Sequence, residues 1–163
     1  MDAKVEPTDV DHLVWGNVLP VDPDGFYTGR VAALNVGMPE ESCALQVNRA
    51  CGSGTQAIIT AAQQIMTGHS KIALAGGGEN FSRGGFVNQK MRWGAIRGAQ
   101  PFEDSVEWAY NDPFGHGLMG VTGENLADDF QYLREDMDKW GEMSQQRAGA
   151  VSYTHLTLPT KDS

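Results

Sequence analysis

One cysteine stands in the middle of the stretch Val47-Asn48-Arg49-Ala50-Cys51-Gly52-Ser53-Gly54-Thr55-Gln56-Ala57. The residues before it, 44–49, have the composition of a short apolar strand. The residues after it carry apolar side chains at three- and four-residue spacing, which is typical of an amphipathic helix that ends at Gly68: Ala57, Ile58, Ala61, Ala62, Ile65 and Met66. The sequence therefore places Cys51 at or just before the start of a helix.

A cysteine in that position is a candidate nucleophile. The free amide groups and the positive end of the helix dipole stabilise an anion, and this favours the reactive thiolate. Gly52 and Gly54 lack side chains that would obstruct a substrate carbonyl or the amides that must bind its developing oxyanion. The arrangement suits acyl transfer through a thioester. The alternative is that Cys51 is a small buried residue that fills a tight turn.

Strand and helix patterns alternate over the first half of the chain. Strands are predicted near 12–18, 44–49 and 71–76, with helices near 27–36 and 55–67 between them. This order predicts an α/β fold with a largely parallel sheet. From about residue 81 the pattern becomes irregular and mainly helical, with helices predicted at 121–131 and 134–149. Three tryptophans are expected to help this part to pack: Trp93, Trp108 and Trp140.

Several motifs together resemble the amino-terminal domain of a thiolase. The resemblance is strongest over residues 46–83, which include the Cys51 stretch and the run Gly76-Gly77-Gly78-Glu79-Asn80. It continues upstream through Gly16-Asn17-Val18. Downstream it includes blocks that resemble the loop region of the family: Arg92-Trp93-Gly94, Asp112-Pro113-Phe114-Gly115, Thr122-Gly123-Glu124-Asn125 and Ser144-Gln145-Gln146-Arg147.

The resemblance implies a partial thiolase-type layered fold and a specific chemistry. Cys51 matches the family's nucleophile, which takes the acyl group from an acyl-CoA and releases CoA. A second acyl-CoA then condenses with the acyl-cysteine, and the reverse sequence cleaves a 3-oxoacyl-CoA. CoA thioesters are substrates in this scheme, and no metal or redox cofactor is implied. Met119 matches a substrate-pocket position, and Leu118 stands where many members have a histidine. His116 is expected on a loop or at the surface.

Two catalytic motifs of the family do not occur in this sequence. They are a Gly-His-Pro motif, whose histidine activates the nucleophile, and a glycine-flanked cysteine that removes the α-proton. The other cysteine, Cys43, lies in a Ser-Cys-Ala context and is expected to be structural. A disulfide between the two cysteines is not expected, because cytosolic thiols stay reduced.

The resemblance also predicts how the chain is divided. Residues 1–80 match part of the amino-terminal domain and residues 81–150 match part of the loop region. Residues 151–163 leave the family pattern and resemble translated sequencing-adapter read-through, so a non-native tail is expected there. We therefore expect a fragment of a longer enzyme that is inactive by itself.

The charge of the chain limits the classes of partner. A net charge of −9 and a pI near 4.7 argue against nucleic acid and against an anionic membrane. No apolar run has the length of a membrane span. A cytoplasmic location is the expectation. The segment 82–100 carries four basic residues and no carboxylate, and it is either a solvated loop or a segment that approaches the phosphates of CoA.

Two other functions remain open from the sequence. A ketosynthase of the same superfamily also uses a cysteine at a helix start, paired with histidines or with histidine and asparagine. A catalytically silent association module is the second alternative, since thiolases dimerise through the strand that matches residues 44–49. By the same resemblance, the parent protein is expected to be a homodimer or homotetramer.

Overall fold

The computed structural model describes residues 4–152, which belong to two compact units. The first unit ends at Tyr110 and the second begins at Asn111. Segment 81–110, assigned from the sequence to the loop region, therefore lies in the same unit as the nucleophile. Of the tail expected over 151–163, residues 153–163 lie outside the described part of the chain, and residues 151 and 152 are the last two residues of a helix.

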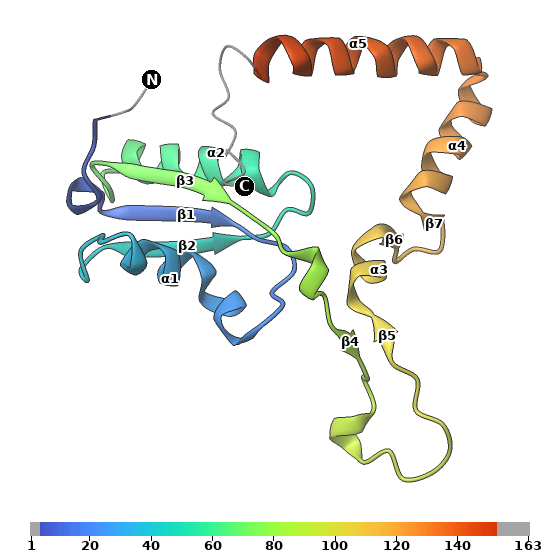
Figure 1. The fold of residues 1–163 in the computed structure, drawn as a ribbon, viewed down its shortest axis with the longest axis horizontal. Helices are drawn as coiled ribbons and strands as arrows, with labels where there is room; N and C mark the ends of the chain where they lie inside the picture. Colours follow the sequence, from blue (N-terminus) through green and yellow to red (C-terminus); the bar gives the residue numbers. More distant parts are fainter. Residues whose placement is uncertain (1–3, 153–163) are drawn as a thin grey trace, which may run out of the picture. The chain divides into compact units, whose positions relative to one another are not determined.

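A three-stranded parallel sheet forms the centre of the first unit (Figure 1). Its strands are β1 (His12–Gly16), β2 (Cys43–Val47) and β3 (Ala73–Gly77), in the order β2-β1-β3. The register brings Gly16, the last residue of β1, level with Val47 and Gly77. All three strands end together, and the predicted α/β fold with a parallel sheet is confirmed.

The central strand β1 is covered by a helix on each face (Figure 1). Leu13 packs with Ala33 of α1 (Thr28–Asn35), and Val14 packs with Ala57 of α2 (Ser53–Met66). Successive side chains of a strand point to opposite faces, so the adjacent apolar residues of β1 serve two different layers. Both predicted helices are confirmed.

The buried face of α2 is narrower than the apolar pattern predicts. Ala57 and Ala61 are buried against β1 and β3, whereas Ile58 is exposed and Met66 has 84% of its surface exposed. Small side chains let the helix lie close to the sheet, and the larger apolar residues then point outward. Ile58 and Met66 therefore belong to an exposed outer face of α2.

The rest of the first unit is irregular, as the sequence predicts. A two-stranded antiparallel sheet pairs β4 (Phe86–Val87) with β5 (Glu103–Asp104), and α3 (Ser105–Tyr110) follows directly. Trp93 has 86% of its surface exposed, so the expectation that it helps to pack this region is wrong. It lies in a single 3₁₀ turn, Met91–Trp93.

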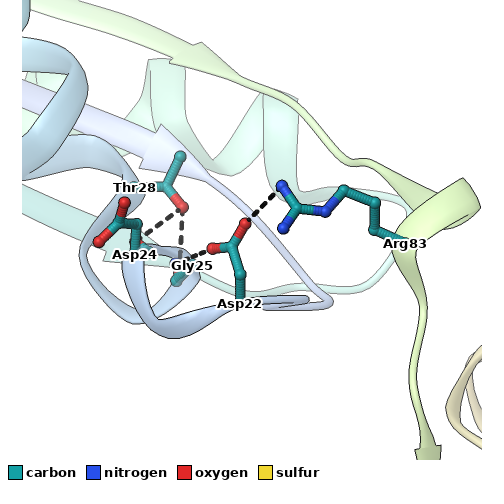
Figure 2. Close-up of polar contacts among 5 residues, drawn as sticks. All are labelled: Asp22, Asp24, Gly25, Thr28 and Arg83. Atoms are coloured by element: carbon teal, nitrogen blue, oxygen red, sulfur yellow. Dashed lines mark hydrogen bonds and ion pairs between the residues drawn. The ribbon is translucent and has the colours of Figure 1, made fainter.

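A carboxylate joins two loops at the edge of the first unit (Figure 2). Asp22 precedes a 3₁₀ turn, Pro23–Tyr27, and accepts the Gly25 N–H through Oδ1 at 2.8 Å. Its Oδ2 lies 2.9 Å from the guanidinium of Arg83. Thr28 donates its hydroxyl to the Gly25 carbonyl at 3.0 Å. These contacts fix the start of α1 and anchor the segment that follows β3.

The second unit contains a short hairpin and two helices. Strands β6 (Asn111–Asp112) and β7 (Gly117–Leu118) pair antiparallel, and α4 (Met119–Phe130) and α5 (Arg134–Ser152) follow. Both helices agree with the prediction. Trp140 is 69% exposed on α5, so its expected packing role is also wrong. Within residues 4–152, no helix has both the length and the apolar character needed to cross a bilayer.

Candidate functional site

A cleft of about 560 Å³ opens where the three strands end. The carboxyl end of a parallel sheet is the usual place for a ligand site in α/β folds. Four segments of the first unit line the cleft: the end of β1, the turn after β3, the start of α2 and the end of α3. The residues that define its walls include Val18, Cys51, Gly54, Gly78, Glu79 and Tyr110.

Cys51 is an exposed thiol in the wall of this cleft. Helix α2 begins at Ser53 with Gly52 as its N-cap, so Cys51 is the residue directly before the cap. The predicted position at the helix start is confirmed. The alternative, a cysteine buried in a tight turn, is wrong because Cys51 is accessible to solvent.

The backbone immediately before Cys51 has an unusual conformation. Ala50 has a φ of 45°, in the left-handed region that residues with a side chain rarely adopt. Three side-chain hydrogen bonds hold it there. Asn48 Oδ1 accepts the Ala50 N–H at 3.0 Å, and Ser53 Oγ donates to the Ala50 carbonyl at 2.7 Å while accepting the Arg49 N–H at 2.9 Å. The sharp turn that presents Cys51 is therefore fixed by its polar neighbours.

The same hydrogen bonds decide which backbone amides remain for a ligand. The N–H groups of Gly52 and Ser53 donate to the Arg49 and Ala50 carbonyls, both at 3.0 Å. Gly54 and Thr55 lie in the first turn of α2, where an α-helix offers no carbonyl acceptor to the N–H groups. A Cβ added at Gly54 would meet no atom within 4 Å. The open space beside Gly54 is therefore part of the access to the cleft.

Glycines allow the segments behind Cys51 to approach each other closely. A Cβ on Gly77 would lie 2.6 Å from the Gly16 carbonyl oxygen, and one on Gly16 would lie 3.0 Å from the Ser53 backbone. A Cβ contact of 2.6 Å would force the backbone to shift, and one of 3.0 Å would be tighter than most Cβ contacts in proteins. The glycine turn after β3 is therefore close-packed against the end of β1, and the end of β1 against the start of α2.

The predicted pocket residues belong to the second unit. Leu118 ends β7 and precedes α4, and Met119 is the first residue of that helix; both side chains are about half exposed. The cleft around Cys51 is built from residues of the first unit, and a role for Leu118 and Met119 in it stays a prediction. His116 lies in the exposed hairpin turn next to Asp112, as expected from the sequence.

The other cysteine is also a free, exposed thiol. Cys43 is the first residue of β2 and lies level with His12 of β1. It is not among the residues that line the Cys51 cleft. The two cysteines thus form a natural pair for comparison, one inside the cleft and one outside it.

Comparison with known proteins gives a consistent match along most of the chain. The family model for the thiolase N-terminal domain matches residues 1–156. The beta-ketothiolase BktB of Cupriavidus necator is 43% identical over 149 residues, which are 91% of this chain and 38% of that protein. The mitochondrial 3-ketoacyl-CoA thiolase of Homo sapiens is 38% identical over 151 residues, which are 92% of this chain and 38% of that protein.

Solved structures agree with the sequence matches. The crystal structure of human mitochondrial 3-ketoacyl-CoA thiolase superimposes with a TM-score of 0.82 at 37% identity, over 91% of this chain and 38% of that one. The same enzyme is also similar in its complex with CoA. The acetyl-CoA acetyltransferase of Syntrophomonas wolfei gives a TM-score of 0.80 at 29% identity, again over 91% of this chain and 38% of that one. The chain thus spans just over a third of the length of these relatives.

The family match covers β1, the Cys51 turn, the glycine turn after β3 and the two units alike. From its sequence and its fold together, this chain belongs to the thiolase family and corresponds to part of the N-terminal domain.

Proposed function

We propose that Cys51 is the nucleophile of an acyltransferase that exchanges acyl groups between CoA thioesters. The observation that carries the proposal is the exposed Cys51 in a cleft, directly before α2, in a chain of the thiolase family. The relatives bear the names of beta-ketothiolase and 3-ketoacyl-CoA thiolase, and one similar structure contains CoA. These relatives support an acyltransferase with acyl-CoA and CoA as its ligands.

In the proposed reaction the Cys51 sulfur attacks the carbonyl carbon of an acyl-CoA. The bond from that carbon to the CoA sulfur breaks, and CoA leaves with a proton as the free thiol. A second acyl-CoA then loses its α-proton to a base, and its enolate carbon attacks the acyl-cysteine. This step forms a 3-oxoacyl-CoA and restores Cys51, and thiolysis is the reverse. The scheme uses no metal or redox cofactor, and we place the reaction in the cytoplasm.

The proposal assigns only some of the groups that the reaction needs to residues of this chain. The first-turn amides of α2 at Gly54 and Thr55 are candidates to bind the carbonyl oxygen. Leu118 and Met119 are proposed to shape the acyl pocket. The sequence contains no Gly-His-Pro motif to supply a base. We therefore propose that the 163-residue chain by itself does not catalyse acyl transfer between CoA thioesters.

A chimera provides a direct test of the proposed activity. The chain replaces its matching segment in the beta-ketothiolase of Cupriavidus necator, which is 43% identical, and thiolysis of acetoacetyl-CoA is measured. We expect turnover that is abolished by Cys51→Ser and retained in Cys43→Ser. Turnover that survives Cys51→Ser would disprove the assignment of the nucleophile.

The isolated chain provides a second measurement if the chimera does not fold. It is incubated with acetyl-CoA, and each cysteine peptide is examined by mass spectrometry for an added acetyl group. We expect slow acetylation of Cys51 and none of Cys43. Catalytic thiolysis by the isolated chain, if lost in Cys51→Ser, would disprove its proposed inactivity.

We also propose that the parent protein is a homodimer or homotetramer that pairs through β2. This strand is at the edge of the sheet, and an edge strand offers unpaired N–H and C=O groups to another chain. The Cys43 N–H donates to Asp11 on the β1 side, so the N–H of Ala44 faces the open side by the alternation of a strand.

The substitution Ala44→Pro removes this outward N–H and leaves the ladder to β1 in place. In the active chimera, light scattering is expected to show a loss of dimer for Ala44→Pro and an unchanged dimer for the matched control Ala44→Val. An unchanged dimer in both variants would exclude pairing through this edge.

A further inference from the structure

One carboxylate oxygen connects the segment after β1 to the turn after β3. Glu79 Oε1 accepts hydrogen bonds from the Asn17 side-chain amide at 2.9 Å, from the backbone N–H of Val18, and from that of Leu19 at 3.3 Å. Three donors therefore converge on one acceptor oxygen, and hydrogen bonds to a carboxylate are stronger than those between neutral groups.

The contact continues into the buried interior through Asn17. This residue is only 7% exposed, and its amide also donates to the Gly78 carbonyl at 2.9 Å. Its Oδ1 accepts from Gln46 of β2 at 3.3 Å, and Gln46 also donates to the Gly25 carbonyl at 3.1 Å. Polar side chains from the ends of β1, β2 and β3 therefore form one connected network.

The segments held by Glu79 form the wall of the Cys51 cleft. Val18, Gly78 and Glu79 line this cleft together with Cys51. An ion pair outside the cleft supports the same wall. Arg83 binds Asp22 and so fixes the 3₁₀ turn that contains Phe81, which also lines the cleft. Without the carboxylate, the Val18 and Leu19 amides lose their shared acceptor, whereas Gly78 stays joined to β1 through its own backbone and through Asn17.

We propose that Glu79 is a positioning residue of the acyl-transfer site, whose carboxylate holds the Val18–Leu19 backbone and the glycine turn as a fixed wall facing Cys51. The inference rests on the proposed function for its role in acyl transfer. Glu79 acts through the backbone that it binds and does not itself react. It selects bound acyl groups by keeping the cleft in one shape.

The test compares two alkylating reagents on the two cysteines of the full 163-residue chain. Iodoacetamide needs only an accessible thiol, whereas its N-benzyl derivative carries a ring that must fit the cleft. Peptide mass spectrometry gives the rate ratio of the two reagents at each cysteine. Cys43 is the internal control in every molecule, since it lies outside the cleft.

In the wild-type chain, the N-benzyl reagent is expected to be favoured at Cys51 over Cys43. In Glu79→Ala this preference falls by about fivefold toward the Cys43 value, as loss of a contact of about 1 kcal/mol implies. Glu79→Gln recovers part of it, because an amide oxygen still accepts hydrogen bonds. Glu41→Ala, which changes an exposed glutamate before β2, is the matched charge control and leaves the ratios unchanged.

An unchanged ratio at Cys51 in both Glu79 variants would overturn the proposal, and so would an equal change at Cys43, which indicates general loosening. If Glu79→Ala does not fold, the ratio in Glu79→Gln alone decides. Acetylation of wild-type Cys51 by acetyl-CoA is measured in parallel. Its absence counts against the proposed function, whereas the reagent ratios test the positioning role independently.

Discussion

The carboxylate of Asp22 caps a 3₁₀ turn and lies 2.9 Å from the guanidinium of Arg83, so one side chain performs two tasks. The two contacts use different oxygens, Oδ1 for the Gly25 N–H and Oδ2 for Arg83. Substitution can therefore separate the cap from the ion pair.

Asp22→Ala removes both contacts and is expected to lower the free energy of unfolding by about 1 kcal/mol, the usual value of an N-cap. Asp22→Asn keeps a capping oxygen and loses the charge, so it costs about 0.5 kcal/mol or less, as is typical of exposed ion pairs. Urea unfolding measures the loss in the free energy of unfolding for both variants. A loss in Asp22→Asn equal to that in Asp22→Ala would show that the ion pair dominates.

Asp11 predicts a pH dependence of stability. Hydrogen bonds from the Ser70 hydroxyl and then from the Lys71 N–H hold the pKa of Asp11 below its ordinary value of 3.8. Because the folded pKa is lowered, the unfolded chain binds more protons between the two values. The contribution of Asp11 is therefore complete above pH 3.8 and is lost as the pH falls through the lowered pKa.

Urea midpoints of wild type and Asp11→Asn, measured from pH 7 down to pH 2.5, are expected to differ most at neutral pH and to converge below pH 3.8. Asp129→Asn, on the exposed surface of α4, is the charge control. A gap between wild type and Asp11→Asn that stays constant down to pH 2.5 would contradict the prediction.

The left-handed Ala50 predicts an unusual response to glycine. Its φ of 45° costs a residue with a Cβ about 1 kcal/mol or more, which glycine avoids. After allowing for the greater freedom of glycine in the unfolded chain, Ala50→Gly is expected to stabilise the protein by about 0.5 kcal/mol. Ala50→Val should destabilise it, because a branched side chain tolerates this conformation least.

The matched control is Ala57→Gly, in the buried face of α2, where the same change is expected to cost about 1 kcal/mol. Thermal unfolding of Ala50→Gly, Ala50→Val and Ala57→Gly gives the order of their stabilities. Equal losses at positions 50 and 57 would mean that the turn before Cys51 is not strained.

Two glycines of the cleft should respond to alanine in opposite directions. At Gly77 the new Cβ would meet the Gly16 carbonyl at 2.6 Å, and we expect a loss of about 1–3 kcal/mol from overpacking. Gly54 lies in the first turn of α2 with open space around it. Alanine at this position should raise the free energy of unfolding by about 0.5–1 kcal/mol.

Chemical unfolding of Gly77→Ala and Gly54→Ala checks the signs, and acetylation of Cys51 checks the site. Gly54→Ala is expected to be more stable but slower to acetylate, because the methyl group occupies part of the entrance. A faster reaction in this variant would show that the space beside Gly54 is not used by the substrate.

The sequence predicts the sheet unit well because its signals are local. Each strand and helix of this unit has its own apolar pattern, and β1 is apolar toward both faces, with Leu13 and Val14 in different layers. The Cys51 position is predictable for the same reason, since a strand ends and a helix begins within a few residues.

The remaining features depend on contacts between distant residues. Asn17 and Glu79 both lie in recognisable motifs, but nothing in the sequence indicates that Glu79 accepts three hydrogen bonds across the ends of two strands. The sequence does not reveal the strain at Ala50, because alanine is not a usual left-handed residue; the flanking Asn48 and Ser53 are the available signal. The sequence does not reveal the exposure of Trp93 and Trp140, because aromatic composition alone does not identify a packing partner.

The strand order has a consequence for how this protein is made. His12 pairs with both Cys43 and Ala73, so the middle strand of the sheet leaves the ribosome before either of its neighbours. Its Leu13 face is covered once α1 is made, but its Val14 face waits for α2. Its second edge waits for β3, which ends about 60 residues later in a chain made at about 5–20 residues per second. For several seconds of synthesis β1 is therefore an extended apolar segment without all of the neighbours that bury it in the folded unit.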